Sequence, residues 1–130
     1  MDNHNYSHSQ RKGFSIENLA CDYLRHYNLI LIHKNFQSRF GEIDLIMKDN
    51  NPSFLKNILV FVEVRYRRTG LFGGALESIG RDKQKKLMRT AQLYLTKYHE
   101  FSTPPCRFDV VLVSGNLKQP DIQWIVNAFE

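Results

Sequence analysis

Two short apolar runs, residues 41–46 and 60–65, place acidic side chains inside strand-like sequence. The first reads Gly-Glu-Ile-Asp-Leu-Ile and the second Val-Phe-Val-Glu-Val-Arg. Alternate side chains of a strand point to opposite faces, so Glu63 and Arg65 share one face. If the runs pair as neighbouring strands, Asp44 approaches Glu63, and two such carboxylates repel unless a cation lies between them. The pattern therefore predicts a sheet whose inner strands carry a charged cluster.

The remaining sequence predicts two amphipathic helices and three further strands. The expected helices span 9–27 and 81–99, and the expected strands span 29–36, 41–48, 58–67, 106–114 and 122–129, with a turn at 37–39 and a glycine-rich connection at 69–80. The order is α-β-β-β-α-β-β. Short connections favour an antiparallel meander of the first three strands, and the helical crossover favours parallel pairing of the third with the fourth. We expect an α/β fold with a mixed five-stranded sheet flanked by helices.

Composition limits the class of protein. A chain of 130 residues fits one domain, 1–130, and we expect residues 1–8 to be flexible. The polar start and the lack of a long apolar stretch predict a cytoplasmic protein without a membrane span. The net charge of +5 favours a polyanionic partner. The two cysteines, Cys21 and Cys106, have no ligand spacing, so we expect buried thiols in a reducing compartment.

The acids of the two inner strands suit a divalent cation. Mg²⁺ and Mn²⁺ prefer hard oxygen ligands, which Asp44, Glu63 and the backbone carbonyl of Val64 would supply. Arg65 would neutralise charge on a phosphate, and it cannot act as a base because its guanidinium stays protonated. The alternative is that Asp44, Glu63 and Arg65 form a structural ion-pair set.

Glu17 borders the apolar stripe of the first helix and has no cation three or four residues away. It either looks inward and assists the same metal or is a solvated residue at the edge of the stripe.

Basic residues crowd the start of the second helix, where the helix dipole disfavours cations. A phosphate ligand would account for them, because a helix N-terminus also offers free N–H groups. The predicted nucleic-acid contacts are Lys83, Lys85, Lys86, Arg67 and Arg68. The alternative is a solvated basic face. Phe72, in the glycine-rich connection, would stack on a base or plug the local core.

These residues resemble a known set: an acid on a first helix, an acid on a second strand, and Glu-x-Lys or Glu-x-Arg on a third. The set resembles the PD-(D/E)xK nuclease superfamily and, more closely, the bacterial YraN family of uncharacterised proteins. The matching residues are Glu17, Ala20, Leu24, 35–36, 41–46, 61–65, Lys83, 107–110 and 127–129. The resemblance implies a restriction-endonuclease-like fold, a Mg²⁺-dependent endonuclease acting on branched or structured DNA rather than RNA, and a homodimer.

Two positions depart from that pattern. Arg65 stands where the motif has lysine, which keeps the charge but weakens the case for catalysis, and Trp124 replaces an expected histidine. A nucleic-acid-binding module without catalysis, or a protein whose ion cluster only stabilises the sheet, therefore remain alternatives. Asp109 is expected to pair with a nearby arginine.

Overall fold

The computed structural model describes residues 8–50, 57–68, 79–101 and 105–130. The elements run α1 (His8–His26), β1 (Leu29–Ser38), β2 (Gly41–Asp49), β3 (Ile58–Arg67), α2 (Arg81–Lys97), a 3₁₀ turn η1 (His99–Phe101), β4 (Cys106–Ser114) and β5 (Asp121–Phe129). This is the α-β-β-β-α-β-β order expected from the sequence. The expectations for residues 1–7, for Phe72 and for most of the glycine-rich connection fall outside the described residues.

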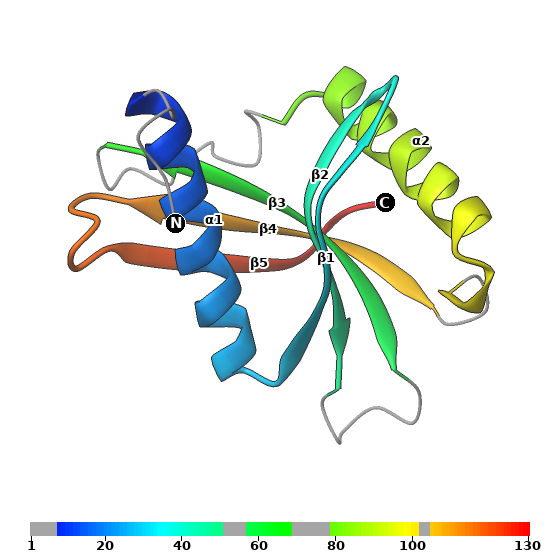
Figure 1. Cartoon of the computed structure of the whole chain (residues 1–130), viewed down its shortest axis with the longest axis horizontal. Helices are drawn as coiled ribbons and strands as arrows, with labels where there is room; N and C mark the ends of the chain where they lie inside the picture. Colours follow the sequence, from blue (N-terminus) through cyan, green and yellow to red (C-terminus); the bar gives the residue numbers. More distant parts are fainter. Residues whose placement is uncertain (1–7, 51–56, 69–78, 102–104) are drawn as a thin grey trace, which may run out of the picture.

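The five strands form one mixed sheet in sequence order, β1-β2-β3-β4-β5 (Figure 1). β1, β2 and β3 pair antiparallel, β3 pairs parallel with β4, and β4 pairs antiparallel with β5. The parallel pair is the one that needs a crossover, and α2 lies in that connection. The predicted α/β fold with a mixed sheet is confirmed.

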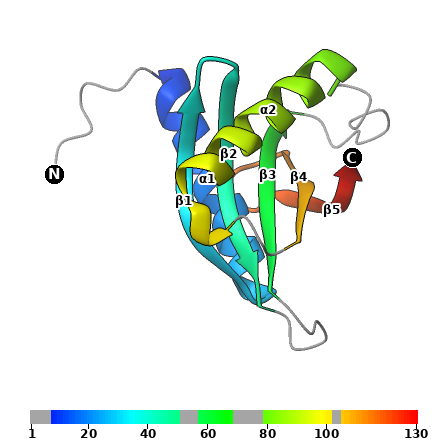
Figure 2. The ribbon, with the colours of Figure 1, turned by 90° about the vertical axis from the view of Figure 1, so that its right-hand side faces the viewer.

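The two helices cover opposite faces of this sheet (Figure 2). Apolar residues of α1 pack on one face with Leu45, Met47 and Val62. Leu87, Ala91 and Tyr94 of α2 pack on the other face with side chains such as Phe61. Because β3 is covered on both faces, its first half, residues 58–62, is apolar throughout, as expected of a central strand.

Six helix and strand boundaries differ by one or two residues from the sequence expectation. β1 continues to Ser38, so the turn is formed by Arg39 and Phe40 rather than by 37–39. Polar side chains extend the hairpin, because Gln37 Nε2 donates to Glu42 at 3.2 Å and the Ser38 hydroxyl donates to the Gly41 carbonyl at 3.2 Å. α1 begins at His8. α2 ends at Lys97, so of the last two residues expected in this helix Tyr98 is the C-cap and His99 begins η1.

The thiol prediction was right for Cys21 and wrong for Cys106. Cys21 packs in the core under α1, whereas Cys106 is exposed at the start of β4. The first residue of a strand lies at the rim of the sheet, so its apolar side chain has no layer above it.

Asp109 is fully buried in β4 and forms the predicted arginine pair. Arg107 donates through Nε and a terminal nitrogen at 3.0–3.2 Å, and Arg107 also pairs with Asp49 at 3.0 Å. The Trp124 indole and the Asn127 backbone N–H complete the carboxylate's partners at 2.9 Å. This cluster joins β4 to β5 and to the end of β2.

Candidate metal site and its flanking charges

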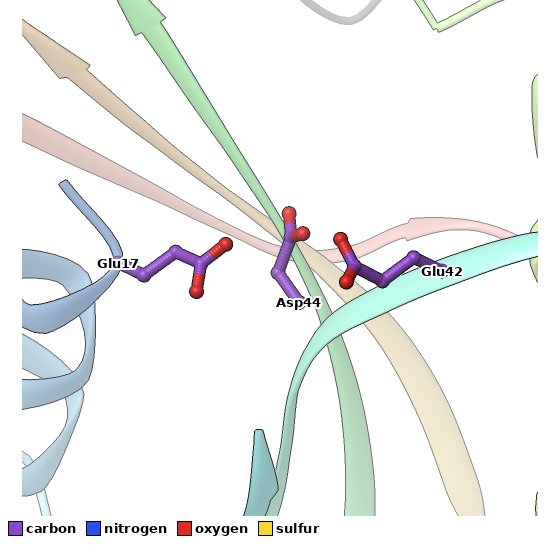
Figure 3. A group of neighbouring side chains, drawn as sticks. All are labelled: Glu17, Glu42 and Asp44. Atoms are coloured by element: carbon purple, nitrogen blue, oxygen red, sulfur yellow. The ribbon is translucent and has the colours of Figure 1, made fainter. Parts of the chain in front are cut away.

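Three carboxylates converge beside β2. Oxygen atoms of Glu17, Glu42 and Asp44 all lie within 4.8 Å of one another, and each side chain is partly buried. Figure 3 shows Glu17 reaching from α1 toward Asp44, while Glu42 reaches toward Asp44 from the other side. The inward orientation of Glu17 is the first of the two alternatives left open by the sequence.

Asp44 lies where the regular ladder ends. The antiparallel pairing of β2 with β3 has Leu45 opposite Val62 as its last pair at this end. Asp44, the residue before Leu45, lies just beyond that pair. There the Asp44 carboxylate accepts a 2.8 Å hydrogen bond from the Val64 N–H. The side chain is thus held by the backbone of β3, which fixes one of the two carboxylate oxygens.

Two of these carboxylates, Asp44 and Glu17, are only partly compensated. Burial, the charge of Glu63 and the charges of the two neighbouring glutamates raise the pKa of Asp44 from 3.8 to about 8, against the lowering effect of the Val64 hydrogen bond. Burial followed by repulsion from Glu42 also raises the pKa of Glu17, and Lys34 and Asn35 partly oppose this. Within the described part of the chain, no cation is among the groups that shift the pKa of Asp44. Such a site favours a bound cation or protonated acids.

Glu63 acts on Asp44, as expected from the sequence, since its charge is the largest neighbouring charge that raises the Asp44 pKa, and it also faces two cations. Its Oε2 atom lies 2.9 Å from Arg65 Nε and 3.8 Å from Lys83 Nζ. The structural ion-pair alternative therefore describes Glu63 and Arg65, whereas Asp44 joins the glutamate cluster. The buried Arg65 Nε atom lies at ion-pair distance from Glu63, but this contact does not have the geometry of a hydrogen bond. The Val64 N–H binds Asp44, and the predicted role of the Val64 carbonyl as a metal ligand stays a prediction.

Glu42 belongs to the cluster although the sequence analysis assigned it no role. The signal was present in the Gly-Glu-Ile-Asp motif, since residues two apart on a strand face the same way. The tight turn at 39–40 keeps Glu42 inside the paired region, opposite Gln37.

Asn35 is the second residue that the sequence reasoning missed. It has a left-handed backbone with φ +54° and sits at a gap in the β1–β2 ladder, between the pairs Lys34–Leu45 and Phe36–Ile43. The position opposite this gap is Asp44. The Asn35 side chain hydrogen-bonds Glu17 and lowers its pKa. Asparagine tolerates this left-handed conformation better than most residues. The gap in the ladder therefore places a side-chain amide beside the carboxylate cluster.

The predicted nucleic-acid contacts divide into two groups. Lys83 is half-buried and faces Glu63 from the first turn of α2. The other four, Arg67, Arg68, Lys85 and Lys86, are exposed at the end of β3 and on α2. The structure thus leaves these four accessible to a ligand, and the contacts themselves stay a prediction.

Fold and site together define an α/β protein with a carboxylate cluster at the edge between a helix and the inner strands of a mixed sheet. The model of the uncharacterised protein family UPF0102 matches residues 16–113, and the chain belongs to this family. This confirms the predicted resemblance to the YraN family, which is this same family, whereas the resemblance to the nuclease superfamily stays a prediction. No described helix has the length and apolar character needed to span a membrane.

Relatives match over nearly their whole length. The chain is 45% identical to a UPF0102 protein of Stutzerimonas stutzeri over 95% of the chain and 98% of that protein. It is 47% identical to a UPF0102 protein of Nitrosomonas europaea with the same coverage. A UPF0102 protein of Nitrosococcus oceani is 45% identical over 91% of the chain and 90% of its own length.

Proposed function

We propose that this protein is a Mg²⁺- or Mn²⁺-dependent endonuclease that hydrolyses phosphodiester bonds in branched or structured DNA. The observation that carries the proposal is the cluster of Glu17, Glu42 and Asp44. Burial, then the charge of Glu63 and the charges of the two cluster glutamates, raise the pKa of Asp44 to about 8. Buried carboxylates that repel one another lower the stability of the folded state, and a bound cation would offset that loss.

The donor set fits a hard divalent cation. Three carboxylates supply only oxygen, which suits Mg²⁺ and Mn²⁺ and not the softer metals that select thiolate or imidazole ligands. Glu17, Glu42 and Asp44 would hold the ion, and Glu63 and Val64 stay predicted ligands. When bound, a divalent ion in such a site supplies Lewis-acid polarisation of a phosphate oxygen and a more acidic water.

The chain's own cations supply the phosphate-binding part. Arg65 and Lys83 flank Glu63, so they present positive charge beside the carboxylate cluster, and Glu63 holds them in place. A guanidinium offers several donors in one plane, which suits bidentate contact with phosphate oxygens. The net charge of +5 supports a polyanionic substrate.

The cleavage assay uses branched, flapped and linear DNA with Mg²⁺ or Mn²⁺ and with EDTA. Wild-type protein should cleave in a metal-dependent manner, and Asp44→Asn, Glu17→Gln and Glu42→Gln should each lose most of that activity. Glu100→Gln, in the exposed η1 turn, is a matched charge control purified identically. Equal cleavage by wild type and all three cluster variants would reveal a contaminating nuclease and refute the proposal.

A second candidate is a nucleic-acid-binding module of the same fold without catalysis. The specific observation in its favour is the arginine at position 65, which is paired with Glu63 where the motif has lysine. The same assay separates the two, because the module would show salt-sensitive binding and no cleavage with either metal.

A further inference from the structure

The tip of the β1–β2 hairpin is locked onto the middle of α2. Ser38 and Thr90 share a 2.9 Å hydroxyl–hydroxyl hydrogen bond, and Thr90 is fully buried. The Phe40 N–H donates to the Ser38 hydroxyl at 3.0 Å, which ties the turn to the same contact. Figure 1 shows the hairpin curving alongside α2. The turn residues are therefore presented by a rigid junction of two elements.

Two arginines lie over the Phe40 ring at this junction. The guanidinium of Arg39 is 4.9 Å from the ring centroid and that of Arg89, from α2, is 5.4 Å away. Both arginines are exposed. A guanidinium held over an aromatic ring keeps its N–H donors at its edge, where they can bind phosphate oxygens. The ring thus orients two cations that come from different elements.

Arg89 also ends a row of cations on α2. Arg81, Lys85 and Arg89 are four residues apart, so they lie on one helix face, and all three are exposed. Like charges at this spacing destabilise a helix by about 0.2 to 0.5 kcal/mol per pair, so helix stability does not account for the row. A surface hollow of about 390 Å³ opens beside Arg81 and Lys85, lined also by Gln84, Met88 and Glu130.

The elements that carry these cations also carry residues of the candidate site: β2 continues from the Arg39–Phe40 turn, and α2 holds the row of Arg81, Lys85 and Arg89. Glu42 follows Phe40 by two residues on β2, and Lys83 on the first turn of α2 contacts Glu63. From Arg81 to Arg89 the helix rises about 12 Å, which corresponds to several nucleotide steps of about 3.4 Å. The surface has the charge and the length to follow a phosphate backbone.

We infer that Arg39, Phe40 and Arg89, with Arg81 and Lys85, form a track that binds the phosphate backbone of a nucleic-acid strand on the elements that also carry Glu42 and Lys83. This inference rests on the proposed function and names the surface that would hold its substrate. Phosphate contacts of this kind position the strand without reading its sequence.

The test is fluorescence anisotropy of a labelled DNA duplex at several salt concentrations between about 50 and 200 mM. Arg39→Gln and Arg89→Gln should each weaken binding and reduce the slope of log affinity against log salt by about 0.9, the value for one lost phosphate contact. Phe40→Leu keeps both charges but removes the ring, so affinity should fall with little change of slope. Circular dichroism checks that each variant is folded.

Lys97→Gln is the matched control, because Lys97 is an exposed cation on the same helix, 5.5 Å from the Tyr98 ring centroid, at the end away from the hairpin turn. If Arg39→Gln and Arg89→Gln behave like this control, or if wild type binds no DNA, the track is refuted.

Hydrolysis of bis(p-nitrophenyl) phosphate with Mn²⁺ distinguishes failure of the track from failure of the proposed function. This small diester needs the carboxylate cluster but not an extended surface. Metal-dependent hydrolysis with unchanged salt slopes in the arginine variants would refute the track alone. Reduced slopes without any hydrolysis would support the track and refute the nuclease.

Discussion

At the scale of single residues, Asp44 carries the largest electrostatic strain among the carboxyl groups whose pKa is shifted. The folded protein raises its pKa from 3.8 to about 8, because the carboxylate is buried beside other acids. One hydrogen bond from Val64 does not offset this. The folded state therefore favours a proton or a bound cation at Asp44, and the ionised carboxylate without either lowers stability.

The first prediction concerns Asp44→Asn in metal-free buffer. A pKa raised on folding means that Asp44 contributes most stability below about pH 4 and loses that contribution as the pH rises toward about 8. Asparagine does not ionise and can still accept the Val64 hydrogen bond. We expect the melting temperature of Asp44→Asn to exceed that of wild type by a margin that grows from pH 4 to pH 8. Thermal melts with EDTA measure this, and a margin independent of pH would contradict it.

The second prediction separates the two roles of Asn35, its backbone and its amide. Asn35→Gly keeps access to φ +54°, whereas Asn35→Ala adds roughly 1 to 2 kcal/mol of left-handed strain. Both remove the amide that contacts Glu17. We expect only the alanine variant to lose stability, and both to bind Mn²⁺ about tenfold more weakly.

Isothermal titration with Mn²⁺ and urea unfolding measure the two effects of Asn35 independently. If Asn35→Gly binds Mn²⁺ as wild type does, the amide has no part in the site and the residue serves only the backbone.

At the scale of elements, the strands are joined by polar contacts as well as by the apolar core. The Asp109 carboxylate in β4 accepts hydrogen bonds from Arg107, the Trp124 indole and the Asn127 N–H. Arg107 also forms an ion pair with Asp49 at the end of β2. β5 is an edge strand paired only with β4. The buried carboxylate therefore adds side-chain hydrogen bonds to the backbone ladder that joins β5 to β4.

The third prediction is that Asp109→Ala destabilises the protein by about 3 to 5 kcal/mol, because it removes a buried charge partner and leaves the indole and amide donors unpaired. Urea unfolding measures the loss. Asp22→Ala is the control, since Asp22 is exposed and its ion pair with Arg25 spans 3.9 Å, so the change should stay within about 0.5 kcal/mol. Similar losses in both variants would contradict the structural role of Asp109.

At the scale of the whole molecule, folding builds the cluster and a bound cation should in turn stabilise the fold. A ligand that binds only the folded state at about 100 times its dissociation constant adds about 2.7 kcal/mol. The fourth prediction is that Mn²⁺ raises the melting temperature of wild type and of Glu100→Gln, but not that of Asp44→Asn. Differential scanning calorimetry at pH 7 measures this. An equal rise in Asp44→Asn would place the ion elsewhere.

Much of the architecture could be predicted because it follows from local pattern. Helical and alternating apolar periods located both helices and all five strands, and the short and long connections implied the antiparallel and parallel pairings. The hairpin turn was misplaced because Gln37 and Ser38 are turn-like residues that side-chain hydrogen bonds draw into the strands.

The sequence by itself determined which residues carry charge and on which elements they lie, since composition and periodicity act locally. Only the tertiary structure decided how these charges are grouped. Glu63 pairs with Arg65 and Lys83, and Asp44 converges with Glu17 and Glu42, while the charge of Glu63 still acts on Asp44. The physical reason is that the regular ladders break around Asp44, where Asn35 turns left-handed, and strict alternation along a strand cannot foresee such a break.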